Sequence, residues 1–547
     1  MKKFNLYILL FAFFAGTLSC KKQLEVRNPN LPTPDNAQTE AGVVSLAQGG
    51  IYVNGFRNLK YGDGIFGLFW SGAIGFHEMM ADVVQAEAAN GYINQIGTPD
   101  KVLLDNGTVI LNPSAPNTQK ALLRQINTNA NQGNNPIYYE WGFMYNMINA
   151  CNSVLEGVEK VPFTGDAVTK KATIQAWAYY WKGFAYARLG SIYYAGLIEN
   201  TSLTTNGNFV AKEKVIAESN ANLDKAAALL TSITATAVYT DILGRVIPSF
   251  NQVGKGGVLT PDMWKRSINT LKARNILVNT AAAAMTAAQW NAILTLTNTG
   301  IQPADKVFTG RSNSTSDFLA ASNGTVAARV QGTTAGINTY KLSERFVMEF
   351  KTGDKRYTNN IKQTAAWIGN SDRGNSFNTR FTLIDGGAGL ANVVVYSNTA
   401  VGGQELFLAG QYEENELMKA EALINTGKTD EGLARLDAVR TYQGAGLAAV
   451  SGTGLSLAQA KEELRRERRV ALPFIGLSFY DARRYGIINP LSEGGGRKGV
   501  VLVAPTSGAV NTNATIEYNY LDYWDVPDTE LVYNPPAAGS AAVKNPK

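Results

Sequence analysis

Apolar residues recur at helical spacing through much of the chain. Near the start of this pattern, one helix face carries Val43, Leu46, Ala47, Ile51 and Tyr52. The same spacing predicts further helices over 70–88, 138–159, 173–195, 215–234, 264–280, 286–296, 407–425, 429–440 and 458–469. Stretches rich in Gly, Asn, Thr and Ser separate the helices, and the longest are 299–403 and 491–547. The pattern therefore predicts a mostly α-helical protein.

Two neighbouring helices within 408–442 form a predicted hairpin. Ala420-Glu421-Ala422-Leu423 ends the first helix, Gly427 caps it, and Leu433 and Leu436 lie in the returning helix. Tetratricopeptide-like hairpins have this form, and they occur in arrays because one pair cannot bury its own apolar face. We expect one body, 38–547, with tetratricopeptide-like helix pairs over about 38–298 and 405–486, a large loop-rich insert at 299–404 and a loop-rich C-terminal region at 487–547.

The N-terminal segment has the pattern of a secretion signal. Lys2 and Lys3 precede an uncharged apolar run over 4–16, which is shorter than the ~20 residues that span a bilayer. Small residues then lead to Cys20, which predicts a lipoprotein signal peptide at 1–19 and lipidation of Cys20; an ordinary signal peptide with an incidental cysteine is the alternative. The polar, proline-containing segment that follows predicts a lipidated tether over 20–37.

The composition argues against several kinds of chemistry. Charged residues make up 17% of the 547 residues, and 50 basic against 44 acidic side chains give a net charge of +6 without a basic stripe, so we expect no nucleic-acid partner. His77 is the single histidine, which argues against zinc sites and histidine-based catalysis. Glu78 and Asp82 lie near it and could form a metal or acid–base cluster, but a packed histidine is the simpler interpretation. We expect no metal and no cofactor.

Several sequence blocks occur in a recognisable order. The first blocks are Trp141-x3-Tyr145-x2-Ile148-Asn149-x2-Asn152 and the aromatic segment 176–196. They are followed by Ser343-Glu344-x-Phe346, Gly353-Asp354-Lys355-Arg356, Glu414 to Leu423 with Leu436-Asp437-x2-Arg440, Glu467-Arg468-Arg469 to Phe474-x-Gly476, Phe479-Tyr480-Asp481-x-Arg483-Arg484-Tyr485-Gly486 and Val526-Pro527-x2-Glu530-Leu531-x2-Asn534-Pro535. In this order the blocks resemble the SusD/RagB family of outer-membrane nutrient-binding lipoproteins.

The resemblance implies both a fold and a partner. It implies four tetratricopeptide-like helix pairs that carry a loop-rich face, and a TonB-dependent outer-membrane transporter of the SusC type that the lipoprotein covers as a lid. It also implies a lipid-anchored location in the outer membrane, facing the cell exterior. The sequence departs from the family's pattern at Ala471, Ile475 and Ser478, where Glu, Glu and Arg are usual. We interpret these as ion pairs of the relatives that are replaced here by apolar contacts.

Sugar binding uses flat aromatic faces together with a few hydrogen-bonding groups. Trp367 stands beside a polar loop in the insert, and Tyr92 lies with Asn94 in a loop after a predicted helix. With Trp70 they are the candidate ligand-binding residues, although each aromatic could instead serve packing. Packing is the expected role of the tryptophans at helical spacing: Trp141, Trp177, Trp181, Trp264 and Trp290.

Three classes of function are consistent with these features. The favoured one is a non-enzymatic surface protein that captures an oligomeric nutrient, preferably a glycan, and delivers it to the transporter; a peptide ligand is the alternative within that class. The second is a glycosidase with paired carboxylates, and the third is a helical-repeat scaffold that binds other proteins only.

Overall fold

The computed structural model describes residues 38–56, 59–60, 66–67, 69–86, 95–112, 118–130, 135–234, 236–313, 319–320, 325–330, 332, 340–367 and 377–547. Its helices form the larger part of the structure, as the apolar spacing predicts. The long helices are α7 (Pro136–Val158), α8 (Ala167–Ile192), α9 (Lys212–Thr231) and α11 (Pro261–Val278), and the shorter ones include α2 (Glu40–Leu46), α10 (Ala237–Val246) and α12 (Ala287–Asn298). The later helices are α15 (Tyr412–Asn425), α16 (Thr429–Tyr442), α17 (Leu457–Ala471) and α18 (Ser478–Arg484).

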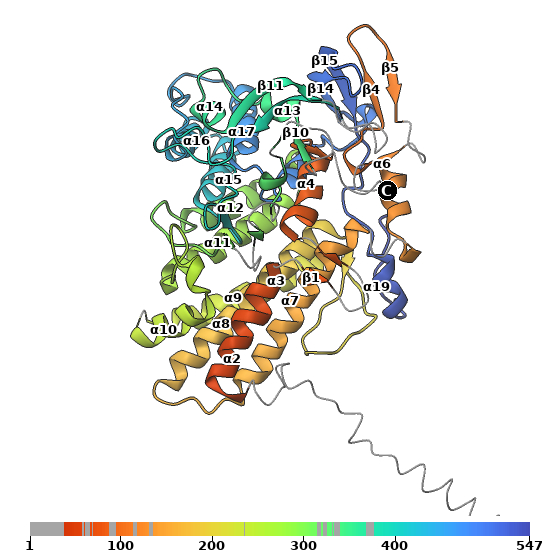
Figure 1. Ribbon diagram of the computed structural model, residues 1–547. Coiled ribbons are helices and arrows are strands. Elements are labelled where there is room, and N and C mark those ends of the chain that lie inside the picture. Colours follow the sequence, from red (N-terminus) through yellow and green to blue (C-terminus); the bar gives the residue numbers. More distant parts are fainter. Residues whose placement is uncertain are drawn as a thin grey trace, which may run out of the picture.

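Sequential helices pack in pairs, which is the predicted tetratricopeptide-like arrangement. Helix α8 packs on α7 and α9, α11 on α12, and α15 on α16. In Figure 1 the helices α2, α7 and α8 lie side by side at one end, and α15, α16 and α17 gather at the other. Helix α12 contacts α15 and therefore joins the two groups. The mostly α prediction is thus confirmed.

Local sequence signals set the ends of these helices. Thr260 accepts a hydrogen bond at the start of α11, where Pro261 is tolerated because the first helical turn needs no N–H donor there. Ser456 and Gln459 form a reciprocal capping box at the start of α17. Between α15 and α16, Gly427 adopts φ +84°, a left-handed conformation that glycine takes without strain and that ends the first helix.

Short sheets lie beside the helices. Strands β14 (Arg497–Val503), β15 (Val510–Glu517), β4 (Lys101–Leu103) and β5 (Val109–Leu111) form an antiparallel sheet in that order, which is at the top right of Figure 1. Two-stranded pairs join β3 (Val84–Ala86) to β10 (Tyr340–Leu342), and β11 (Ile361–Trp367) to β12 (Thr379–Leu383). Strand β13 (Glu405–Phe407) pairs with β8 (Thr309–Asn313), which lies beside β9 (Leu319–Ala320). The region after residue 487 therefore contains a β-hairpin, β14–β15, whose register shifts at two places.

Several predicted helices have different bounds in the structure; α8, for example, begins at Ala167 and not at residue 173. Two of the differences have a visible long-range cause. The helix expected over 70–88 consists of a π-helical turn, Phe69–Ala73, and α4, Ile74–Met80, and it ends before Asp82. Asp82 has φ +57°, and its carboxylate accepts hydrogen bonds from Arg345, so a long-range contact ends the helix and starts β3. The helix expected over 407–425 begins at Tyr412, because Phe407 pairs with Thr309 in a sheet.

A single large core connects the helix pairs. Rings of Trp177, Trp181 and Trp264 surround Phe308, and Tyr52 packs on Trp177 and Trp181; the ring centroids in contact lie 5.2 to 6.2 Å apart. The tryptophans expected to serve packing are all buried. Cys151 is a buried free thiol, as its position among apolar helix residues predicts. Within the described ranges, no helix combines the length and the apolar character needed to cross a membrane.

Candidate functional site

A cavity of about 870 Å³ lies where the helix pairs meet the C-terminal segment. Ligand pockets commonly have volumes of about 300 to 1,000 Å³. Its wall is formed by the loop after α11, by α12, by the last turn of α15, by α17, by the end of α18, and by residues near the C-terminus. The polar and aromatic side chains that line the cavity include Lys212, Asn279, Trp290, Glu421, Asn425, Lys461, Glu462, Arg465, Arg483, Arg484, Tyr485, Asn489, Asp522, Tyr523 and Lys547.

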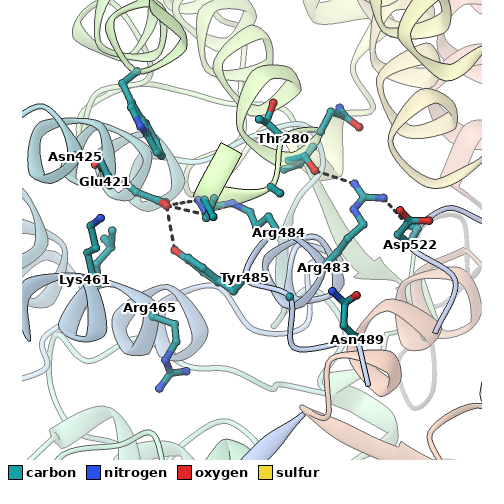
Figure 2. A pocket seen from close by; sticks show the side chains of 18 of the residues that line it. Thr280, Glu421, Asn425, Lys461, Arg465, Arg483, Arg484, Tyr485, Asn489 and Asp522 are labelled. Atoms are coloured by element: carbon teal, nitrogen blue, oxygen red, sulfur yellow. Dashed lines mark hydrogen bonds and ion pairs between the residues drawn. The ribbon is translucent and has the colours of Figure 1, made fainter. Parts of the chain in front are cut away.

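Arg483 holds three separate segments at the floor of the cavity. Its Nη1 donates to the carbonyl oxygens of Ser191 and Asp522 at 2.7 and 2.9 Å, and its Nη2 donates to that of Val278 at 2.8 Å. The ends of α8 and α11 are thereby tied to the C-terminal segment, and Figure 2 shows Arg483 directed toward Asp522. A guanidinium near a helix C-terminus also interacts favourably with the helix dipole. Arg483 therefore holds the three chain segments that meet at the cavity in fixed relative positions.

Tyr523 completes the floor next to Arg483. Its ring centroid lies 4.1 Å from the Arg483 guanidinium carbon and 4.6 Å from the Lys212 Nζ, which are cation–π distances. Its hydroxyl donates to the side-chain oxygen of Asn279 at 3.1 Å. The ring is fixed in place by these contacts and presents little free surface.

On the opposite wall, Glu421 is held by Arg484 and Tyr485. Arg484 Nη1 donates to Glu421 Oε1 at 2.8 Å, and the Tyr485 hydroxyl donates to the same oxygen at 3.1 Å. In Figure 2 both side chains point toward this carboxylate. Among the described residues, nothing donates a hydrogen bond to the second oxygen, Oε2, which is buried. A ligand hydroxyl that reached Oε2 would make a charge-assisted hydrogen bond.

The mouth of the cavity carries polar groups that can face a ligand. Lys461 is exposed on α17, and Asn425 and Asn489 are partly exposed on two other segments. Amides and an ammonium group both suit the hydroxyl groups of a polyhydroxylated molecule, because amides donate and accept while the ammonium donates. The indole of Trp290 lies in the wall near them. The arrangement is chemically suited to hold a polar oligomer.

The three carboxylates of the cavity are all engaged in ion pairs. Glu421 pairs with Arg484, Glu462 pairs with Arg465, and Asp522 pairs with Lys547. Burial by itself raises the pKa of Asp522, but hydrogen bonds from Lys547 and Asn545 outweigh it and hold the pKa below its usual value. Each of the three carboxylates therefore has a cationic partner within the protein.

The structure buries two of the predicted ligand-binding residues. Trp70 is 3% exposed, and its ring stacks on Phe56 and contacts Phe69 edge-on. Trp367 is 4% exposed at the end of β11, with Lys341 Nζ 5.5 Å from its ring centroid. Both burials favour the packing role, because a stacked sugar requires an exposed ring face. A role for either residue in ligand binding stays a prediction.

The remaining predicted residues lie elsewhere. Tyr92, Asn94 and Cys20 fall outside the described residues. Neither Trp70 nor Trp367 lines the 870 Å³ cavity, so the structure does not bring the four ligand-binding candidates together there.

The possible cluster of His77, Glu78 and Asp82 separates into different contacts. His77 Nε2 lies 2.8 Å from Glu140, whereas Glu78 accepts hydrogen bonds from Gly476 N and Ser478 Oγ at 2.9 and 2.8 Å. Burial is the largest influence on Glu78 and raises its pKa to about 7. Within the part of the chain that the structure describes, no group of three His, Cys, Asp or Glu side chains could hold a metal ion.

At Ser478, one of the departures from the family's pattern, the structure shows a different contact from the one expected. Ser478 was expected to replace an ion pair by an apolar contact, but its hydroxyl donates to Glu78, so the replacement is polar. The basic run Arg465–Arg469 forms ion pairs, for example between Arg465 and Glu349 at 2.7 Å. No sequence signal marks the cavity residues as a group: Arg483 and Tyr485 belong to one of the ordered blocks, and Tyr523 lies outside these blocks.

Comparison with known proteins supports the fold. No protein-family model matches the sequence, and no curated protein matches it. Solved structures do match it. A SusD-like carbohydrate-binding protein from Bacteroides fragilis aligns over 91% of this chain and 99% of its own, with 15% identity and a TM-score of 0.54. A SusD homologue from Bacteroides thetaiotaomicron covers 85% of this chain and 89% of its own, with 15% identity and a TM-score of 0.53.

A third structure, described with a xylogluco-oligosaccharide, covers 93% of this chain and 99% of its own, with 14% identity and a TM-score of 0.52. At such low identity the agreement concerns the course of the backbone, and it extends over nearly the whole length of each chain. The chain therefore has the SusD-like fold that its ordered sequence blocks predict.

Proposed function

We propose that this protein is a cell-surface lipoprotein that captures an oligosaccharide and delivers it to a TonB-dependent outer-membrane transporter. The observation that carries the proposal is the end-to-end agreement of the fold with proteins described as SusD-like and carbohydrate-binding. The predicted signal peptide and Cys20 support the anchor, which would keep the binding protein beside its transporter.

The cavity at the C-terminal segment is a candidate subsite for such a ligand. Its volume would accommodate one or a few sugar units, and the groups at its mouth can bind hydroxyls from several directions. Trp367, Tyr92, Asn94 and Trp70 remain proposed ligand-binding residues. The protein would contribute affinity and selectivity, and it would perform no chemistry on the ligand.

Native affinity electrophoresis of the protein through gels that contain single polysaccharides tests the capture step. Xyloglucan belongs in the panel because one neighbour in fold was described with its oligosaccharide. We expect retardation in at least one gel. Lys461→Ala combined with Asn489→Ala should reduce it if the cavity binds the glycan, and Trp367→Ala should reduce it if the insert does. Lys428→Ala, an exposed change outside the cavity, is the matched control.

Absence of retardation in every gel would contradict glycan capture and favour a peptide ligand. The transporter is tested separately by affinity purification from outer membranes of cells that express the lipidated protein. We expect a TonB-dependent transporter to co-purify in stoichiometric amount. If none does while glycan binding persists, delivery to a transporter is contradicted and capture is retained.

A further inference from the structure

A second, smaller cavity of about 30 Å³ lies between α17, α18 and the start of β14. Four arginines line it: Arg465, Arg468, Arg469 and Arg497. Three of them come from one face of α17, because positions 465, 468 and 469 are separated by three and four residues. One carboxylate, Asp481, also lines the cavity. So strong a concentration of guanidinium groups around a small void calls for a counter-charge.

Two of these arginines are oriented by the backbone at the end of α4. Arg469 Nη1 donates to the Ala81 carbonyl oxygen at 2.7 Å, and Arg497 Nη2 donates to the same oxygen at 2.8 Å. Their Nε atoms are buried and make no hydrogen bond with any described residue, although carboxylates lie 3.4 and 3.6 Å away. Both groups therefore retain an unused donor.

Arg468 retains the clearest unused donor. Its side chain is 2% exposed, and its Nε donates to Asp481 Oδ2 at 2.9 Å. Its Nη1 is buried and has no hydrogen-bond partner within the described ranges. A buried N–H of a charged group without an acceptor is unfavourable, and its presence beside a void points to an acceptor that fills the void.

The ion-pair network around the cavity has more positive than negative groups. Seven arginines (345, 465, 466, 468, 469, 484 and 497) share five carboxylates (Asp82, Glu349, Glu421, Glu462 and Asp481). Arginines therefore outnumber carboxylates in this network, even when the buried Glu78, whose pKa Arg469 lowers, is added to the count. Burial, and then the neighbouring charge of Arg497, lower the pKa of Arg469 to about 9. At Arg465 and Arg468, neighbouring carboxylates outweigh burial and raise the pKa instead, so Arg469 is the one of these three arginines whose charge the surroundings disfavour.

We propose that this cavity binds one small monatomic anion, with chloride as the natural occupant. A cavity that holds one or two water-sized particles has room for chloride. Chloride accepts hydrogen bonds from several N–H groups at once and supplies negative charge, whereas a water molecule would leave the excess charge in place. Arg465 and Tyr485 line both this cavity and the 870 Å³ cavity, so the anion would fix a shared wall.

Bromide provides the direct test, because it replaces chloride and scatters X-rays anomalously. Crystals of the protein soaked in bromide should show an anomalous peak inside the cavity, within hydrogen-bonding distance of Arg468 Nη1. A cavity that contains only water, without such a peak, would overturn the proposal. This measurement uses the unaltered chain and does not depend on whether a variant folds.

The solution test compares thermal unfolding in chloride and in gluconate at equal ionic strength. We expect chloride to raise the Tm by about 2 °C or more, in a saturable manner. Arg468→Gln should abolish the chloride-specific part, while Arg435→Gln, which changes a half-exposed arginine outside the cavity, should keep it. Equal chloride responses in wild type and Arg468→Gln would contradict the assignment.

Discussion

The buried carboxylate of Glu140 should control the stability of the protein in acid. Its Oε1 lies 2.5 Å from Arg188 Nε, and its Oε2 lies 2.8 Å from His77 Nε2, in a site closed to solvent. Burial raises the pKa of Glu140, but the charge of Arg188 and the hydrogen bonds from both partners outweigh burial and lower the pKa to about 2. Burial lowers the pKa of His77, so the imidazole is neutral and donates to Glu140.

The free energy by which ionised Glu140 stabilises the fold follows from the difference between its pKa of about 2 and the ordinary value of 4.5. At about 1.36 kcal/mol per pH unit, the ionised carboxylate stabilises the fold by about 3 kcal/mol at neutral pH. Because the pKa is lowered in the folded state, this stabilisation is complete well above pH 4.5 and disappears as the pH falls toward 2. At about pH 3.5, about 1.4 kcal/mol of it should be lost.

The perturbation is Glu140→Gln, which removes the titrating group and leaves Arg188 buried without its counter-charge. We expect the free energy of unfolding at neutral pH, measured by urea titration, to fall by about 3 to 5 kcal/mol. The difference between wild type and variant should then shrink by about 1.4 kcal/mol between neutral pH and about pH 3.5. Glu159→Gln, in an ion pair whose acid is 53% exposed, should cost less than about 1 kcal/mol. A difference that is constant across this pH range would refute the reasoning.

Three further changes test other parts of the structure. Gly476→Ala should reduce the free energy of unfolding by about 1 to 3 kcal/mol in urea titrations, since Gly476 has φ +76° and a Cβ there would lie 2.7 Å from Ile74. Cys151 is buried and burial raises its pKa, so mass spectrometry should find it unmodified by iodoacetamide in the native protein and modified in urea. Arg356→Met should cost about 3 to 5 kcal/mol by urea titration, because Asp354 and Glu467 would remain buried without their shared cation.

Each of these predictions has its own control. Gly494→Ala places alanine at φ +80° with open space around it, so its loss of stability measures the backbone strain alone. An equal loss for Gly476→Ala would show that the contact with Ile74 contributes nothing. Rapid labelling of native Cys151 would show that its helix opens readily. Arg435→Met removes an ion pair at 3.9 Å whose arginine is half-exposed. If it lowered the free energy of unfolding as much as Arg356→Met, the large cost predicted for a buried ion pair would be contradicted.

The fold could be predicted further than the site. Apolar spacing located most helices, because a helix that packs on one side repeats its apolar residues at a fixed period. The end of the helix before Asp82 could not be predicted, since it depends on Arg345, more than 260 residues later. Asp354 and Arg356, two residues of one ordered sequence block, form an ion pair at 2.8 Å.

The cavity could not be predicted from the sequence, because it too depends on contacts between distant residues. Its floor requires Arg483 to meet Ser191, Val278 and Asp522, four positions that no local pattern connects. Polar neighbours in the sequence made Trp367 a candidate ligand-binding residue, but the exposure of a side chain depends on the whole fold. The sequence shows the consecutive arginines Arg483 and Arg484, but it does not show which residues they contact.

The three hydrogen bonds of Arg483 also bear on how the molecule opens. One guanidinium joins the last residues of α8 and α11 to residue 522, so none of these segments can move away without breaking a buried polar contact. Local unfolding occurs in cooperative units, and shared contacts of this kind define such a unit. Native-state hydrogen exchange should therefore show the amides around these three chain segments opening together, with a common free energy of opening.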